Sequence, residues 1–243
     1  MGKIFITSDL HFGHNKSFLY EPRGFSTIEE HDQEIIKRWN SVIELEDEVY
    51  ILGDLMLNDN DYGMECLQQL RGKLHIVVGN HDTARRVELY ASIPAVQEVK
   101  DIIHLKYRGY LFYCSHYPTI TSNNDIDKPL KARVLNLCGH SHTQERWSDA
   151  DKGYIYHVEL DAHNCYPIAL DDIIAEFREQ YINNIEVPKP YNAYLEREKY
   201  HQERCNKCVH FRYDCGGPRL VAPQTCPPAY NYKRDPPDGG YYG

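Results

Sequence analysis

Seven residues of metal-binding types stand directly after short apolar segments of the chain, most of them beside a glycine. They occur at five places, namely Asp9 and His11 in an Asp-x-His, Asp54 in a Gly-Asp, Asn80 in a Gly-Asn-His-Asp, His116, and His140 and His142 in a Gly-His-x-His. Neutral imidazoles and carboxylates together suit Mn, Fe or Zn better than Mg or Ca. The residue types therefore predict a site for divalent transition-metal ions.

Two such ions would be suited to the hydrolysis of phosphate esters. This reaction requires neutralisation of the charge on the non-bridging oxygens and a strong nucleophile at neutral pH. A pair of divalent cations about 4 Å apart supplies both, because it clamps the phosphoryl group and lowers the pKa of a bridging water. The pair needs a bridging carboxylate and a mixed set of oxygen and nitrogen ligands, which the seven residues contain.

Strands of an α/β sheet can bring these distant residues to one edge. Each of the five places follows an apolar segment, at 3–8, 49–52, 74–78, 110–114 and 134–138. Ligands of α/β sheets bind outside the carboxyl ends of the strands, where loops from several strands converge. Helical periodicity is predicted in three segments, one opening at Ser26 or Thr27, one over about 62–70 and one over 170–181. We expect an α/β fold, a layered α/β/β/α sandwich of two mixed sheets.

In this order, the five motifs resemble those of the calcineurin-like metallophosphoesterase superfamily over about residues 3–175. The resemblance implies that one metal ion is held by Asp9, His11 and His142. It implies that a second ion is held by Asn80, His116 and His140. The carboxylate of Asp54 would bridge the two ions, and a bridging hydroxide would attack phosphorus.

The resemblance gives His81 a role other than metal binding. Its imidazole would assist the leaving-group oxygen as a general acid or hydrogen-bond donor, with Asp82 orienting or polarising it. His14 could contact the substrate phosphate or cap a loop. Arg85 could pair with a substrate phosphate through its guanidinium fork, or lie with Arg86 on a solvated helix face.

The chain departs from two branches of the superfamily. Serine/threonine protein phosphatases follow the Gly-Asp with Asp-Arg-Gly, where this chain has Leu55-Met56-Leu57-Asn58, and they have Glu in place of Asp82. Purple acid phosphatases have a metal-binding Tyr at the position of Leu57. The chain is more similar to small prokaryotic and phage-type phosphoesterases. We therefore expect a phosphodiester or phosphomonoester substrate that is small and nucleotide-like.

The formal net charge of -9 limits the partners of the protein. Broad non-specific binding of nucleic acid depends on many Lys and Arg contacts to phosphates, so a metal-dependent nuclease is the less favoured alternative. No apolar run approaches the length of a membrane span. The apolar stretch at the N-terminus is too short for a signal peptide, so a cytoplasmic protein is expected.

The C-terminal segment differs from the rest of the chain. Residues 1–180 carry 18 Lys and Arg against 29 Asp and Glu, whereas residues 181–243 carry 9 against 7. We expect a phosphoesterase domain at 1–182, a linker at 183–200 and a Cys-rich tail at 201–243. The tail has four thiols suited to one structural zinc ion, or alternatively to an iron–sulfur cluster, at Cys205, Cys208, Cys215 and Cys226. A binding platform whose tail recruits a partner is the alternative from another functional class.

Overall fold

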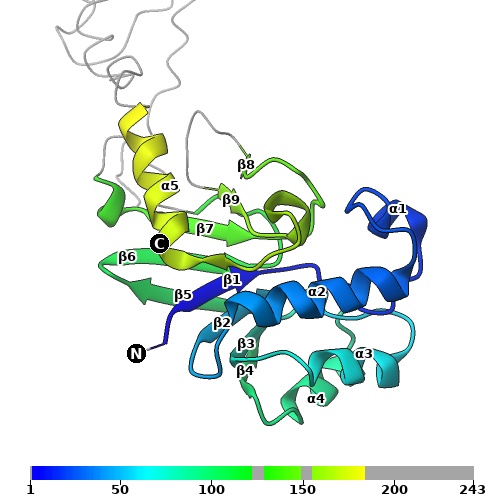
Figure 1. Ribbon diagram of the computed structural model, residues 1–243. Coiled ribbons are helices and arrows are strands. Elements are labelled where there is room, and N and C mark those ends of the chain that lie inside the picture. The colour runs from blue at the N-terminus through cyan, green and yellow to red at the C-terminus, as the bar shows by residue number, and fades with distance from the viewer. Residues whose placement is uncertain (1, 122–128, 149–154, 184–243) are drawn as a thin grey trace, which may run out of the picture. The chain divides into compact units, whose positions relative to one another are not determined.

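The computed structural model describes residues 2–121, 129–148 and 155–183, which lie within the first of two units of the chain, Met1–Glu186. They form a mixed α/β fold built on two five-stranded sheets (Figure 1). Apart from its first residue, Asn183, the predicted linker lies outside the described residues, as does the Cys-rich tail with all four proposed zinc-binding cysteines.

The first sheet has the strand order β10-β1-β2-β3-β4. Its strands are β1 (Ile4–Thr7), β2 (Glu48–Leu52), β3 (Lys73–Val77), β4 (Val96–Lys100) and β10 (Ile168–Ala169). The first four run parallel, whereas β10 pairs antiparallel with β1. The carboxyl ends of β1, β2 and β3 therefore meet at one edge of the sheet.

The second sheet has the order β5-β6-β7-β9-β8. Its strands are β5 (Ile102–Tyr107), β6 (Tyr110–Ser115), β7 (Val134–Cys138), β8 (Trp147–Ser148) and β9 (Ile155–His157). Strands β5 and β6 form a hairpin that turns at Arg108 and Gly109, both with positive φ. Strands β6, β7 and β9 run parallel, so β6 and β7 also bring their carboxyl ends together.

Five α-helices occur in the described residues, namely α1 (Ser17–Tyr20), α2 (Ile28–Val42), α3 (Asn60–Leu67), α4 (Ala84–Ala91) and α5 (Leu170–Asn183). Helix α2 begins as predicted, because Thr27 accepts a hydrogen bond from the Glu30 N–H, while the Glu30 carboxylate accepts one from the Ser26 N–H. Helix α3 begins two residues before its predicted start, because the Asp59 side chain caps it.

Two apolar cores lie on the two faces of the first sheet. One face packs against α2, α3 and α4, which lie together on one side of the sheet (Figure 1). The other face shares a core with the second sheet and with Ile173 and Phe177 of α5. Four cysteines of the described residues are free and buried, namely Cys66, Cys114, Cys138 and Cys165. None of the helices in the described residues is long and apolar enough to cross a membrane.

Candidate metal centre

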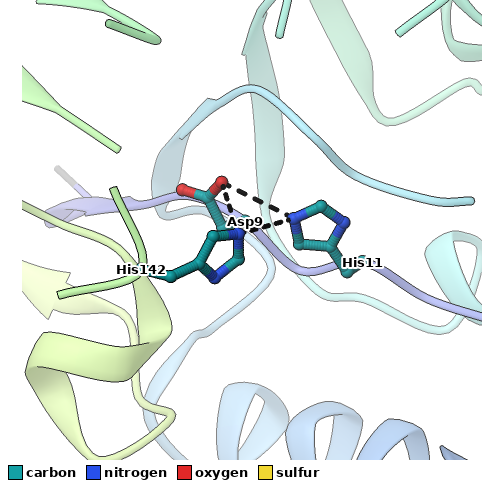
Figure 2. A group of neighbouring side chains, drawn as sticks. All are labelled: Asp9, His11 and His142. Carbon is teal, nitrogen blue, oxygen red and sulfur yellow. Dashed lines mark hydrogen bonds and ion pairs between the residues drawn. The ribbon is translucent and has the colours of Figure 1, made fainter. Parts of the chain in front are cut away.

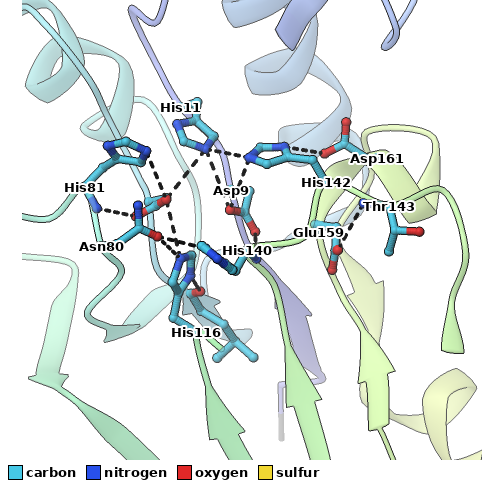
Figure 3. Close-up of polar contacts among 12 residues, drawn as sticks. Asp9, His11, Asn80, His81, His116, His140, His142, Thr143, Glu159 and Asp161 are labelled. Atoms are coloured by element: carbon cyan, nitrogen blue, oxygen red, sulfur yellow. Dashed lines mark hydrogen bonds and ion pairs between the residues drawn. The ribbon is translucent and has the colours of Figure 1, made fainter. Parts of the chain in front are cut away.

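The strand ends bring the seven predicted metal-binding residues to one edge of the two sheets. Asp9 and His11 follow β1, Asp54 follows β2, and Asn80 follows β3. His116 directly follows β6, and His140 and His142 follow β7. The six of these side chains that Figure 3 labels point toward one another at the carboxyl ends of the strands.

Five of these seven residues have a left-handed backbone. The φ angles are 58° at Asp9, 52° at His11, 56° at Asp54, 74° at His140 and 47° at His142. For residues with a Cβ this conformation costs roughly 1–2 kcal/mol each. Such strain concentrates at functional sites, where the surrounding structure holds it in place. The left-handed backbone at these five residues therefore lowers the stability of the fold, and the surrounding structure holds it in place.

One half of the centre consists of Asp9, His11 and His142 (Figure 2). The Oδ1 atom of Asp9 lies 3.7 Å from Nε2 of His11 and 3.7 Å from Nε2 of His142. The two Nε2 atoms are 3.1 Å apart. Asp9 is fully buried, and its Oδ1 has no hydrogen-bond partner among the described residues. A buried carboxylate oxygen without a donor is suited to a cation.

The other half is centred on Asn80, His116 and His140. Oδ1 of Asn80 lies 2.8 Å from Nε2 of His116 and 2.9 Å from Nδ1 of His140. Oδ2 of Asp54 lies between the two halves, 3.4 Å from Nε2 of His116 and 3.8 Å from Nε2 of His11. One carboxylate oxygen therefore faces both groups.

The hydrogen bonds of the His116 ring are also compatible with a cation site. Its Nδ1 lies 2.8 Å from the carbonyl oxygen of Leu52, which can only accept, so Nδ1 donates. Nε2 of the neutral ring then presents a lone pair to the Asn80 oxygen, and two acceptors at this distance need a cation or a proton between them. Burial lowers the pKa of His116, but the hydrogen bond to Asp54 and the charges of Asp9 and Asp54 outweigh it and raise this pKa to about 9. At neutral pH this shift favours a proton on Nε2 when no metal ion is bound.

The glycines of the motifs allow the close packing of the centre. A Cβ added at Gly79 would collide with the Asp54 carboxylate and backbone. A Cβ at Gly139 would collide with the side chains of Ser8 and Asp9. Glycine beside these residues thus permits a close approach of the backbone to the buried carboxylates.

His81 lies at the rim of the centre with 42% of its side chain exposed, and its Nε2 is 3.9 Å from Oδ2 of Asp54. Its backbone is held on both sides, since its N–H donates to Asp54 and its carbonyl accepts from Arg86. The Asp82 carboxylate accepts hydrogen bonds from other groups, namely the N–H groups of Asp54, Leu55 and Gly79 and the hydroxyl of Tyr90. Among the described residues, Asp82 thus binds the Asp54 loop and not the His81 imidazole.

His14 lies near the centre, and Arg85 pairs on a helix surface. The His14 ring is buried, its centroid is 5.2 Å from that of His11, and its Nδ1 has no hydrogen-bond partner among the described residues. Burial, together with the charges of the neighbouring histidines, lowers the pKa of His14 to about 4. The exposed Arg85 side chain of α4 pairs with Glu88, 3.2 Å away.

Two residues beside the centre could not be identified from a sequence motif, namely Asp161 and Arg23. Oδ2 of Asp161, in the short 3-10 helix Leu160–His163, lies 3.1 Å from Nδ1 of His142. Arg23 forms an ion pair with Asp161 at 2.7 Å across 138 positions of sequence. Neither residue belongs to a local motif, and nothing short of the fold brings them together.

The chain is similar to a known protein family and to proteins of an archaeon and of a phage. Residues 3–158 match the calcineurin-like phosphoesterase superfamily domain. The uncharacterized protein MJ1445 of Methanocaldococcus jannaschii is 31% identical over 179 residues, covering 72% of this chain and 90% of that protein. The Gene 66 protein of Mycobacterium phage L5 is 35% identical over 184 residues, covering 67% of this chain and 88% of that protein.

A solved structure shares the fold. The protein of unknown function AQ665 from Aquifex aeolicus is 22% identical and aligns with a TM-score of 0.56, covering 72% of this chain and 100% of its own. At this identity the likeness bears on the fold alone. The family match over residues 3–158 and the Methanocaldococcus jannaschii relative, which is 31% identical, lead to one assignment. The chain belongs to the calcineurin-like phosphoesterase superfamily.

Proposed function

We propose that the protein is a dinuclear metal-dependent phosphoesterase acting on a small, nucleotide-like phosphate ester. The observation that carries the proposal is the position of the Asp54 carboxylate. Its Oδ2 faces His11 in one group and His116 in the other, as a carboxylate shared by two cations must. The membership in a phosphoesterase superfamily supports the reaction class.

Under this proposal one ion is held by Asp9, His11 and His142, a second by Asn80, His116 and His140, and both by Asp54. The donor set of carboxylates, imidazoles and one amide oxygen suits Mn, Fe or Zn. When bound, such a pair neutralises the phosphate oxygens and provides a nucleophile at neutral pH.

Residues of the chain supply a proton for the leaving oxygen and a fixed position for the bridging carboxylate. The exposed His81 imidazole can hold a proton for the leaving oxygen, and its fixed backbone limits the positions it can take. Asp82 fixes the loop of Asp54 through buried hydrogen bonds, which preorganises the bridging carboxylate.

Two exposed aromatic rings support a substrate with a planar group. Tyr117 is 50% exposed, and its ring centroid lies 4.7 Å from that of His140. Phe18 is 70% exposed and contacts His14 edge to face at 5.7 Å. Large aromatic side chains exposed beside a polar centre offer stacking surfaces, and every nucleobase has a face that can use them.

The test is a comparison of substrates in Mn²⁺. We expect hydrolysis of nitrophenyl esters of nucleoside 5′-phosphates with a lower KM than that of the corresponding methyl ester, and Tyr117→Ala should remove much of this difference. Asp54→Asn serves as the inactive control. Equal KM values for nucleoside and methyl esters would refute the nucleotide preference, and hydrolysis that the Asp54 variant retains would refute the reaction centre.

A further inference from the structure

A buried arginine lies behind one half of the proposed metal centre. We propose that Arg23 and Asp161 are positioning residues that fix the orientation and the proton of His142, so that its Nε2 lone pair faces Asp9 and His11. This inference rests on the proposed metal centre for its purpose, although the geometry of the pair is independent of any bound ion.

The Arg23–Asp161 ion pair is bidentate and buried. Arg23 donates from Nε to Oδ1 of Asp161 at 3.0 Å and from Nη2 to Oδ2 at 2.7 Å. Only 1% of the Arg23 side chain and 8% of the Asp161 side chain are exposed. Bidentate arginine–carboxylate pairs are geometrically specific, and breaking a buried one leaves an uncompensated charge. The carboxylate of Asp161 therefore has a fixed orientation.

The fixed carboxylate determines which nitrogen of His142 carries a proton. Oδ2 of Asp161 lies 3.1 Å from Nδ1 of His142, on the side of the ring that faces away from His11 (Figure 3). An ionised carboxylate only accepts hydrogen bonds, so Nδ1 of His142 must donate. Nε2 of the neutral ring is then free to bind a cation. Carboxylates behind metal-binding histidines fix the tautomer and the ring orientation in the same manner.

Arg23 also reaches the second member of this group. Its Nη2 donates to the carbonyl oxygen of Asp9 at 2.9 Å. A single buried guanidinium thus contacts the backbone of one proposed ligand and the carboxylate behind another. Among the described residues, no hydrogen bond or ion pair joins Arg23 to Asn80, His116 or His140 in the other half, so its effect should be confined to one of the two ions.

A series of hydrogen bonds connects the other side of the Arg23 guanidinium to His31 and Asp32. Its Nη1 donates to Nε2 of His31 at 2.9 Å, and Nδ1 of His31 donates to Oδ1 of Asp32 at 2.7 Å. Oδ2 of Asp32 accepts from the N–H of Gly13 at 2.9 Å. The start of α2 and the loop after β1 are thereby connected to the same arginine.

The test uses Asp161→Asn, which keeps the shape of the side chain. Both oxygens of Asp161 accept from Arg23, so in either orientation of the Asn side chain its NH₂ group would face an N–H donor of Arg23. Two donors cannot form a hydrogen bond with each other, so the pair loosens and the constraint on His142 is lost. Titration with Mn²⁺ alone should show one ion bound roughly 10–100-fold more weakly than in the wild type, with the other nearly unchanged. Glu176→Gln is the matched control, because it breaks another arginine–carboxylate pair, with Arg146, that touches no proposed ligand.

A readout without metal separates this inference from the proposed function. Long-range ¹⁵N NMR of the metal-free protein at alkaline pH should find the neutral His142 ring protonated at Nδ1, and Asp161→Asn should shift the proton toward Nε2. Should that variant not fold, Arg23→Lys keeps the charge but lacks the fork, and it should weaken the same ion. Protonation of wild-type His142 at Nε2, or equal weakening of both ions, would overturn the inference. Absence of Mn²⁺ binding in the wild type would instead overturn the proposed function.

Discussion

The left-handed backbone of the metal centre can be tested at His140, whose φ is 74°. The side chain is exposed, so replacing it by Ala or Gly leaves no cavity. Ala in this conformation costs roughly 1–2 kcal/mol, whereas Gly adopts it freely. Part of the advantage of Gly is offset by the entropy of its unfolded chain, roughly 0.4–1 kcal/mol. The metal-free His140→Gly protein should therefore be more stable than His140→Ala by about 1 kcal/mol.

Lys37 provides the matched control, because it is 77% exposed in the interior of α2. There the order should reverse, and Lys37→Gly should be less stable than Lys37→Ala by about 1 kcal/mol. Urea unfolding in the presence of a chelator measures all four variants. With a slope of about 2 kcal/mol/M, each pair should differ in midpoint by about 0.5 M in opposite directions. If Ala were the more stable residue at both positions, the strain argument for the centre would be wrong.

Three further predictions concern other parts of the chain. His81→Gln should keep both metal ions but lose roughly 10²–10⁴-fold in rate on alkyl esters and less on nitrophenyl esters. Metal analysis and kinetics would show this, and loss of metal would instead make His81 a ligand. Burial lowers the pKa of His163 to about 4, whereas the unfolded chain takes up this proton near 6.5, so stability should fall by about 3 kcal/mol as the pH drops from 7 to 4. Urea unfolding at several pH values should show a flatter profile for His163→Gln, and an unchanged profile would exclude this group. If the Cys-rich tail binds zinc, elemental analysis under reducing conditions should find one more metal ion in the full chain than in Cys208→Ser; equal content would exclude the site.

Much of the centre could be predicted from the sequence because its residues stand at the ends of strands. Parallel neighbours carry their carboxyl ends to one edge, so locating β1, β2 and β3 suffices to bring Asp9, Asp54 and Asn80 together. The apolar runs of these strands are strong signals, since the strands are buried on both faces.

Other features depend on contacts that no local pattern encodes. Strand β4 was not predicted, because its residues are half exposed and its alternation is weak. The partners of Asp82 lie on two loops and on α4, so its hydrogen bonds could not be derived from the Gly-Asn-His-Asp motif. The Arg23–Asp161 pair joins a loop before α2 to a segment after β9, and only the packed fold determines it.

The proposed centre is tested most directly by restoring metal to the metal-free protein while measuring bound Mn²⁺ and hydrolysis of a chromogenic phosphodiester in the same sample. Two ions should bind to residues 1–183 of each wild-type chain, and activity should follow occupancy of the second. Asp54→Asn should lose both binding and turnover, because its carboxylate serves both ions. Turnover that does not require metal, or a fully loaded protein that hydrolyses no phosphate ester, would show that this centre is not a two-metal phosphoesterase site.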